Sequence, residues 1–184
     1  MSPQRGIVRS GRSGSVVAVT GAAGAVGAAV TRALQDLVGT DGGPERVIAV
    51  DERRGPVDGP TWRLGDGADP AVAECLDGAD HVVHVTAPTD LEAALDVPVR
   101  VRRLRVVRAA QAVATATAAV GARYLLAITS AMVYGARPDN PVPLPEDAPL
   151  AAHPDDGLVG DLLEVERVLA RIPRSHVAVR VGVL

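Results

Sequence analysis

The sequence contains no lysine and no phenylalanine, and its only cysteine is Cys75. A single cysteine excludes a disulfide within the chain, so we expect a reducing, cytoplasmic setting. No apolar run approaches the ~18 residues that indicate a membrane span. The net charge is −3 and aromatic residues are scarce, which argues against general attraction to nucleic acid or to anionic membranes. We therefore expect neither as a partner.

The chain has 184 residues, enough for one domain with a sizeable buried core. Residues 1–14 are rich in Ser, Gly and Arg and lack the apolar stretch of a signal peptide, so they are predicted to be a disordered leader. Residues 15–184 are predicted to form the domain. Its apolar residues are almost all Ala, Val and Leu, a skew typical of high-GC genomes such as those of actinobacteria.

Short apolar runs rich in β-branched residues alternate with segments of helical spacing. The predicted strands are 16–20, 46–51, 61–64, 81–86, 124–129 and 176–181, and the first two are predicted to be buried. The predicted helices are 28–38, 69–76, 99–120 and 158–171. This alternation predicts an α/β fold of the Rossmann type, a doubly wound parallel sheet of about six strands with helices on both faces.

Three glycines separate the first predicted strand from the first helix. Gly21 suits a tight turn, Gly24 lets the backbone approach a pyrophosphate, and Gly27 permits close packing of helix on strand. The start of the helix also offers N–H groups and a positive dipole end to phosphates. The cofactor-binding candidates in this segment are Gly21, Ala23, Gly24, Ala25, Val26 and Gly27.

Asp51 ends the second predicted strand, where an acidic side chain accepts hydrogen bonds from the adenosine ribose hydroxyls. The other interpretation is an ordinary turn carboxylate. In the first role Asp51 would repel a 2′-phosphate, which favours NAD over NADP. Arg53 and Arg54 follow closely, and either could pair with that phosphate instead. NAD is therefore the predicted cofactor, and NADP is the alternative.

Taken together, these motifs resemble the NAD-dependent epimerase/dehydratase family, the extended short-chain dehydrogenases/reductases. The matching segments follow the family's order and span 20–27, 47–51, 65–66, 80–87, 129–135 and 179–182. The resemblance implies that Asp66 lies near the adenine, and that Val85 and Ala87 lie beside the cofactor. His84, in the same strand, is interpreted as a packed residue rather than a catalyst. The family's C-terminal substrate lobe would follow the last strand and is expected to be absent.

The resemblance also locates the family's catalytic residues. Ser130 falls on the serine that binds the substrate oxygen in active members. With Glu166 setting the register, the family's Tyr-x-x-x-Lys pair is replaced by Leu158 and Leu162. Leucine supplies neither a proton nor a charge, and losing one general acid/base removes about two to four orders of magnitude in rate. We therefore expect a degenerate family member without the family's catalysis.

Two further features concern partners and metals. By resemblance, the helices at 99–120 and 158–171 can form a homodimer. The first of these helices carries a run of arginines, Arg100, Arg102, Arg103, Arg105 and Arg108. The run is interpreted as a solvated helix face, and the alternative is a binding site for a phosphate-bearing ligand or an acidic partner. His153, Asp155 and Asp156 lie in a Pro-flanked loop without further ligands, so no metal site is expected.

Three functions stay open at this point. The first is a nucleotide-sensing or scaffolding domain that retains NAD without catalysis. The second is an active oxidoreductase or epimerase that acts on a sugar nucleotide or similar substrate with a non-standard acid/base, for which Asp161 is available. The third is a protein-interaction module that binds no nucleotide. Cofactor binding separates the third from the others, and turnover separates the second from the first.

Overall fold

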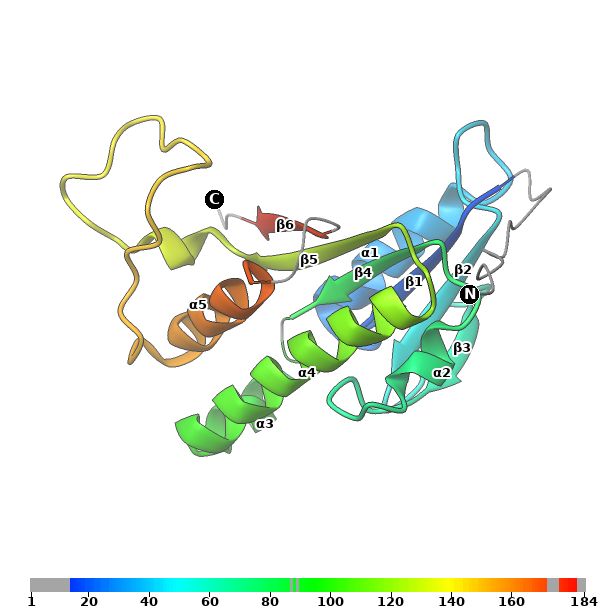
Figure 1. Ribbon diagram of the computed structural model, residues 1–184, viewed down its shortest axis with the longest axis horizontal. Coiled ribbons are helices and arrows are strands. Elements are labelled where there is room, and N and C mark those ends of the chain that lie inside the picture. Colours follow the sequence, from blue (N-terminus) through cyan, green and yellow to red (C-terminus); the bar gives the residue numbers. More distant parts are fainter. Residues whose placement is uncertain (1–13, 87, 89, 172–175, 182–184) are drawn as a thin grey trace, which may run out of the picture.

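The computed structural model describes residues 14–86, 88, 90–171 and 176–181. Its strands are β1 (Val16–Thr20), β2 (Arg46–Asp51), β3 (Thr61–Leu64), β4 (His81–Val85), β5 (Tyr124–Ser130) and β6 (His176–Val181). They form one sheet in the order β3-β2-β1-β4-β5-β6, and every neighbouring pair is parallel (Figure 1). This order confirms the predicted Rossmann-type fold. The predicted leader lies outside the described residues, apart from Gly14.

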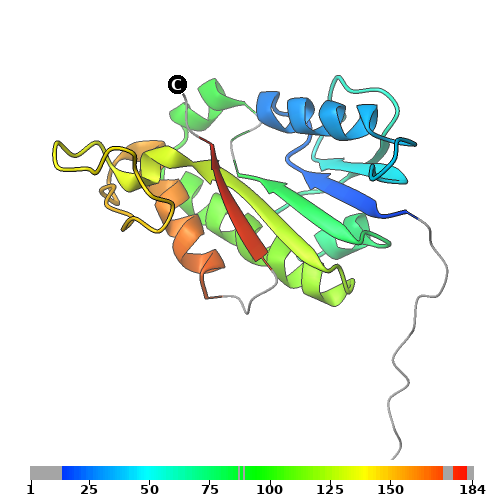
Figure 2. The same ribbon diagram turned by 90° about the horizontal axis from the view of Figure 1, so that it is seen from above.

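The helices are α1 (Ala25–Asp36), α2 (Val72–Leu76), α3 (Leu91–Asp96), α4 (Val99–Ala119) and α5 (Gly157–Leu169), with a 3₁₀ helix η1 (Ala131–Tyr134). Figure 2 shows α1 on one face of the sheet and α4 and α5 on the other. Among the described helices, none is long and apolar enough to cross a membrane.

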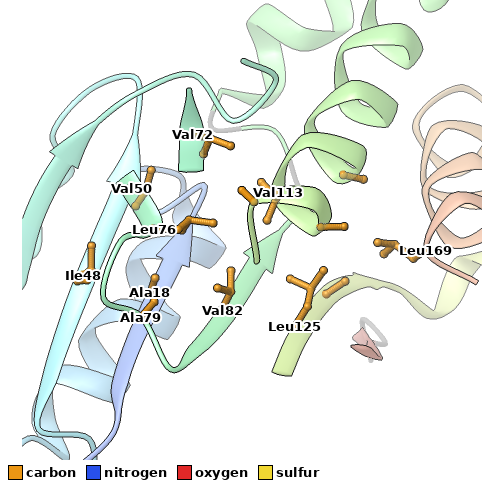
Figure 3. Close-up of a cluster of buried hydrophobic side chains, with 14 of the residues drawn as sticks. Ala18, Ile48, Val50, Val72, Leu76, Ala79, Val82, Val113, Leu125 and Leu169 are labelled. Atoms are coloured by element: carbon orange, nitrogen blue, oxygen red, sulfur yellow. The ribbon is translucent and has the colours of Figure 1, made fainter. Parts of the chain in front are cut away.

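Successive residues of β1 bury their side chains on opposite faces of the sheet. Val16 and Ala18 of β1 belong to the cluster that packs against α2, α4 and α5, whereas Val17 and Val19 belong to the cluster beneath α1. Figure 3 shows the first cluster, in which Leu76 of α2, Val113 of α4 and Leu169 of α5 meet strand residues. Because both faces are covered, the strands read as continuous apolar runs.

The Pro-rich segment between η1 and α5 is held to the body by side chains near its start. The Tyr134 hydroxyl donates to the carbonyl of Glu146 at 2.7 Å, and the Asn140 amide donates to the carbonyl of Gly135 at 2.8 Å. Tyr134 is buried. It therefore has a structural role, as its place in a Tyr-Gly pair implies.

Candidate functional site

A cavity of about 620 Å³ lies where β1, β2 and β4 reach their carboxyl ends. Thr20 and Gly21 line it from β1, Asp51 from β2 and His84 from β4. The strand order reverses between β1 and β4, and open α/β sheets bind their ligands in the crevice at such a switch point. Helices α3 and α4 and the loop after β3 complete the wall. The cavity is thus in the position where this fold holds ligands.

The glycine turn before α1 depends on two of its glycines. Gly21 has a φ of +74°, and a Cβ there would lie 2.7 Å from the carbonyl oxygen of Val85. At Gly27 a Cβ would lie 1.9 Å from the carbonyl oxygen of Gly21. No side chain caps the start of α1 at Gly24, and its first turn has no acidic residue. The N–H groups of this first turn therefore face no acidic residue of α1 itself.

Asp51 connects this turn to β2. Its carboxylate accepts hydrogen bonds from the N–H of Ala23 at 3.0 Å and of Glu52 at 2.8 Å. The side chain is only 8% exposed, yet it lines the cavity. Asp51 therefore fastens the turn, and it also stands in the cavity wall where a ribose partner is expected.

His84 of β4 lies next to Thr20, the last residue of β1. Its Nδ1 is 2.7 Å from Oγ1 of Thr20, and the ring is buried. Burial lowers the pKa of His84 to about 4, so the imidazole is neutral near pH 7. The packed interpretation fits this environment, but it overlooked that His84 lines the cavity. The available signal was its position, a polar residue near the end of a buried strand at the switch point.

Charged side chains surround the mouth of the cavity. Arg105 of α4 forms an ion pair with Glu52, and its Nη2 lies 4.0 Å from Oδ1 of Asp66. All three line the cavity, as does the exposed Arg53. Arg54 pairs instead with the exposed Asp58 at 3.8 Å and is not among the lining residues.

The arginine run of α4 is only partly solvated. Arg102 is 7% exposed, and its Nε donates to Oδ2 of Asp161 at 2.5 Å. Arg103 donates from Nε to Oδ1 of the same carboxylate at 2.9 Å. The interpretation of the whole run as a solvated face is therefore wrong for Arg102 and Arg103, because α5 presents a buried carboxylate to them. Sequence reasoning had considered Asp161 only as a substitute acid/base.

The expected catalytic segment lies at the carboxyl end of β5. Ser130 Oγ accepts from the N–H of Met132 at 3.2 Å and so begins η1. Next to it, the Thr129 hydroxyl donates to Glu166 of α5 at 2.5 Å. Leu158 and Leu162 precede Glu166 by eight and four residues, so the three share one face of α5. Both leucines are half-buried.

The structure brings together part of the predicted cofactor set. The predicted residues that line the cavity are Gly21, Asp51, Arg53, Asp66 and Val85. The others with described positions form the turn and the start of α1 without lining it, namely Ala23, Gly24, Ala25, Val26 and Gly27. Ala87 lies outside the described residues. Sequence reasoning missed Glu52, and it considered Arg102 and Arg105 for a phosphate-bearing ligand only as the alternative to a solvated face; all three line the cavity.

His153 and Asp155 lie 3.7 Å apart in an exposed loop. Within the part of the chain that the structure describes, no group of three or more potential metal ligands gathers.

A family model described as the NAD dependent epimerase/dehydratase family matches residues 17–155. The chain belongs to this family. The match covers the sheet from β1 to β5, the glycine turn and the cavity-lining strand ends. The family predicted from the motifs is thereby confirmed. No curated protein matches the sequence at a significant level.

Solved structures of related enzymes share the fold. The Bordetella bronchiseptica enzyme WbmG, in complex with NAD and UDP, is 24% identical with a TM-score of 0.68, over 91% of this chain and 53% of that one. A short-chain dehydrogenase/reductase superfamily protein from Agrobacterium tumefaciens with bound NAD is 27% identical, with a TM-score of 0.67 over 90% and 48%.

The UDP-N-acetylglucosamine 4-epimerase from Methanobrevibacter ruminantium M1, in complex with UDP-N-acetylmuramic acid, is 21% identical, with a TM-score of 0.70 over 91% and 54%. The chain thus spans about half the length of these solved relatives.

Proposed function

We propose that this domain binds NAD in the cavity at the switch point and does not perform the family's redox chemistry. One observation carries the proposal: Gly21 of the glycine turn, the Asp51 carboxylate and the end of β4 converge on a single cavity. The NAD complexes of WbmG and of the Agrobacterium tumefaciens protein support this ligand.

The residues present fit a dinucleotide. Asp51 would accept hydrogen bonds from the adenosine ribose, and Asp66 would lie near the adenine. The N–H groups of Ala25 and Val26 begin α1 without a side-chain cap and would receive the pyrophosphate. Val85 would pack beside the cofactor. When bound, the nicotinamide supplies hydride transfer, and the protein must supply the matching proton transfer.

The described residues offer poor candidates for that proton transfer. The chain has no lysine, and its tyrosines are Tyr124 and Tyr134. Tyr124 is the first residue of β5 and lies at the amino ends of the strands, whereas the cavity lies at their carboxyl ends. Tyr134 donates its hydroxyl to the carbonyl of Glu146. Asp161 accepts hydrogen bonds from two guanidinium groups, and burial lowers the pKa of His84 to about 4, which makes its imidazole a weak base. These contacts favour retention of the cofactor for sensing or scaffolding over turnover.

Self-association through α4 and α5 belongs to the same proposal. Val101 and Leu104 lie about 60° apart around the axis of α4 and are 57% and 50% exposed. Exposed apolar residues on one helix face favour a homodimer over a free helix face. Light scattering after gel filtration tests this association, and a monomer that persists at high protein concentration would contradict it.

Cofactor binding is tested by calorimetric titration with NAD, NADH and NADP. NAD is expected to bind in the micromolar range, and Asp51→Asn to weaken it by about tenfold or more, because a carboxylate acceptor is lost. Asp58→Asn is the control, since this exposed carboxylate lies in the loop that follows Asp51 but does not line the cavity. Absence of NAD binding to the wild-type protein would overturn the proposal.

The loss of catalysis is tested by restoring the missing pair with Leu158→Tyr and Leu162→Lys. In the wild-type protein, NAD reduction with a panel of UDP-sugars is expected to stay at background. Wild-type turnover that survives Ser130→Ala would contradict both the inactivity and the role assigned to Ser130. A gain of turnover in the double variant would support the register that places the leucines at the lost positions.

A further inference from the structure

One ion pair crosses the mouth of the cofactor cavity. Arg105 projects from α4 and pairs with Glu52, the residue that follows Asp51 at the end of β2. Beyond this pair lies a second hollow of about 720 Å³ that shares Glu52, Asp66 and Arg105 as lining residues. The pair therefore separates the two spaces, beside the end of the cavity where Asp51 would hold a ribose.

The pair contributes little to the stability of the fold. The side chains of Arg105 and Glu52 are 59% and 52% exposed, and exposed ion pairs are weak in water. The Arg105–Glu52 pair instead sets which charged groups lie beside a ligand that enters the cavity. Asp51 and Glu52 present consecutive carboxylates, and Arg105 is the guanidinium bound to the second of them.

We propose that Arg105 is a cofactor-selectivity residue, which Glu52 holds across the cavity mouth so that a dinucleotide with a free 2′-hydroxyl is accepted and a 2′-phosphate is rejected. This inference rests on the proposed dinucleotide binding. While Glu52 holds Arg105, a 2′-phosphate meets the repulsion of Asp51 and Glu52, and Arg105 is already paired. Once Glu52 is neutral, Arg105 keeps only its longer contact with Asp66 at 4.0 Å, and its guanidinium can take the phosphate in a charge-assisted pair.

A double-mutant cycle separates this mechanism from simple repulsion by Glu52. The four proteins are the wild type, Glu52→Gln, Arg105→Gln and the double variant, each titrated with NAD and with NADP at low and high salt. Glu52→Gln is expected to strengthen NADP binding by about tenfold. Its effect on NAD should stay below about threefold, because no phosphate is added to the ribose.

The decisive comparison is the double variant, in which the gain for NADP is expected to disappear. Arg108→Gln is the matched control: Arg108 lies nearly one turn further along α4 and lines only the second hollow. Adding Arg53→Gln to Glu52→Gln should leave most of the gain, since Arg53 is not the residue that Glu52 releases.

The outcomes are distinct. If the gain for NADP persists without Arg105, or disappears with Arg53→Gln instead, the selectivity role of Arg105 is overturned while NAD binding stands. If the wild type binds neither dinucleotide, the proposed function fails and this inference fails with it. A gain that requires Arg105 and weakens with added salt supports the inference.

Discussion

Helices α1 and α5 are attached to the same sheet by different kinds of contact. Helix α1 packs through Val30 and Leu34, and its Gly27 lies against the backbone of Gly21. Helix α5 also buries apolar residues, but its Asp161 and Glu166 are buried as well. Asp161 binds two arginines of α4, and Glu166 accepts from Thr129 of β5.

The two kinds of contact join residues at different separations along the sequence. Gly27 meets a backbone atom six residues earlier, and this contact belongs to the local strand-turn-helix motif. The partners of Asp161 lie 58 and 59 residues away. A helix fixed by apolar and backbone contacts can be recognised from its own segment, whereas one fixed by buried charges requires knowledge of its neighbours.

The largest effect is expected where the buried charges are broken. Asp161→Asn leaves Arg102 buried without its carboxylate and should cost about 3–5 kcal/mol in the free energy of unfolding, measured with urea. The control is Glu164→Gln on the same helix, whose partner Arg167 is 47% exposed, with an expected cost of about 0–1 kcal/mol. Similar losses in both variants would show that burial does not distinguish the two pairs.

The burial of His84 between β1 and β4 is tested by the pH dependence of stability. The unfolded chain protonates His84 near the ordinary pKa of 6.5, but the folded chain does so only near 4, so unfolding takes up a proton between these values. The contribution of neutral His84 to stability is therefore present above pH 6.5 and decreases as the pH falls towards 4. The stability of the wild type relative to His84→Asn should fall by about 3 kcal/mol over this range.

Urea unfolding of both proteins at several pH values measures this difference. His153→Asn is the control, because the His153 side chain is 68% exposed and should follow the pH dependence of the wild type. Parallel stability curves for the wild type and His84→Asn would contradict the lowered pKa.

The backbone contact of α1 is tested by Gly27→Ala. The added Cβ would meet the Gly21 carbonyl oxygen at 1.9 Å, so the helix must shift away from the turn. The expected cost is about 1–3 kcal/mol, together with weaker NAD binding. Ala29→Ser, at an exposed site of the same helix, should cost about 0.5 kcal/mol. Wild-type stability for Gly27→Ala would refute the close packing of α1.

The smallest effect is expected at the surface. Arg54→Gln removes a pair with the fully exposed Asp58 and should leave the free energy of unfolding unchanged. It should also leave NAD and NADP binding unchanged, since Arg54 does not line the cavity. Weaker NADP binding by this variant than by the wild type would indicate that Arg54 contacts the 2′-phosphate.

The elements near the glycine turn were largely predictable. The strands β1 to β3 have the predicted bounds, but α1 begins at Ala25 rather than Ala28. Its first turn is set by the backbone around Gly24, before the apolar spacing begins. Similarly, α2 begins at Val72 rather than Asp69, and α5 spans 157–169 rather than 158–171.

Helix α3 was not predicted, because six residues carry too little periodicity to be recognised. A signal for it existed in Asp90, whose side chain accepts from the N–H of Ala93 at 3.0 Å and caps the helix. This element matters for the site, since α3 contributes Ala93 and Ala94 to the cavity wall.

The sequence by itself determined the family, the parallel sheet and the turn that Gly21 and Gly27 make before α1, because burial on two faces and a tight backbone turn leave local patterns. It also showed directly that these 184 residues contain no lysine. Only the tertiary structure decided which charges meet: Arg102 with Asp161, and Arg105 with Glu52. Those pairs join residues far apart in the chain, and an ionic contact depends on which helix faces and strand ends pack together rather than on any local period.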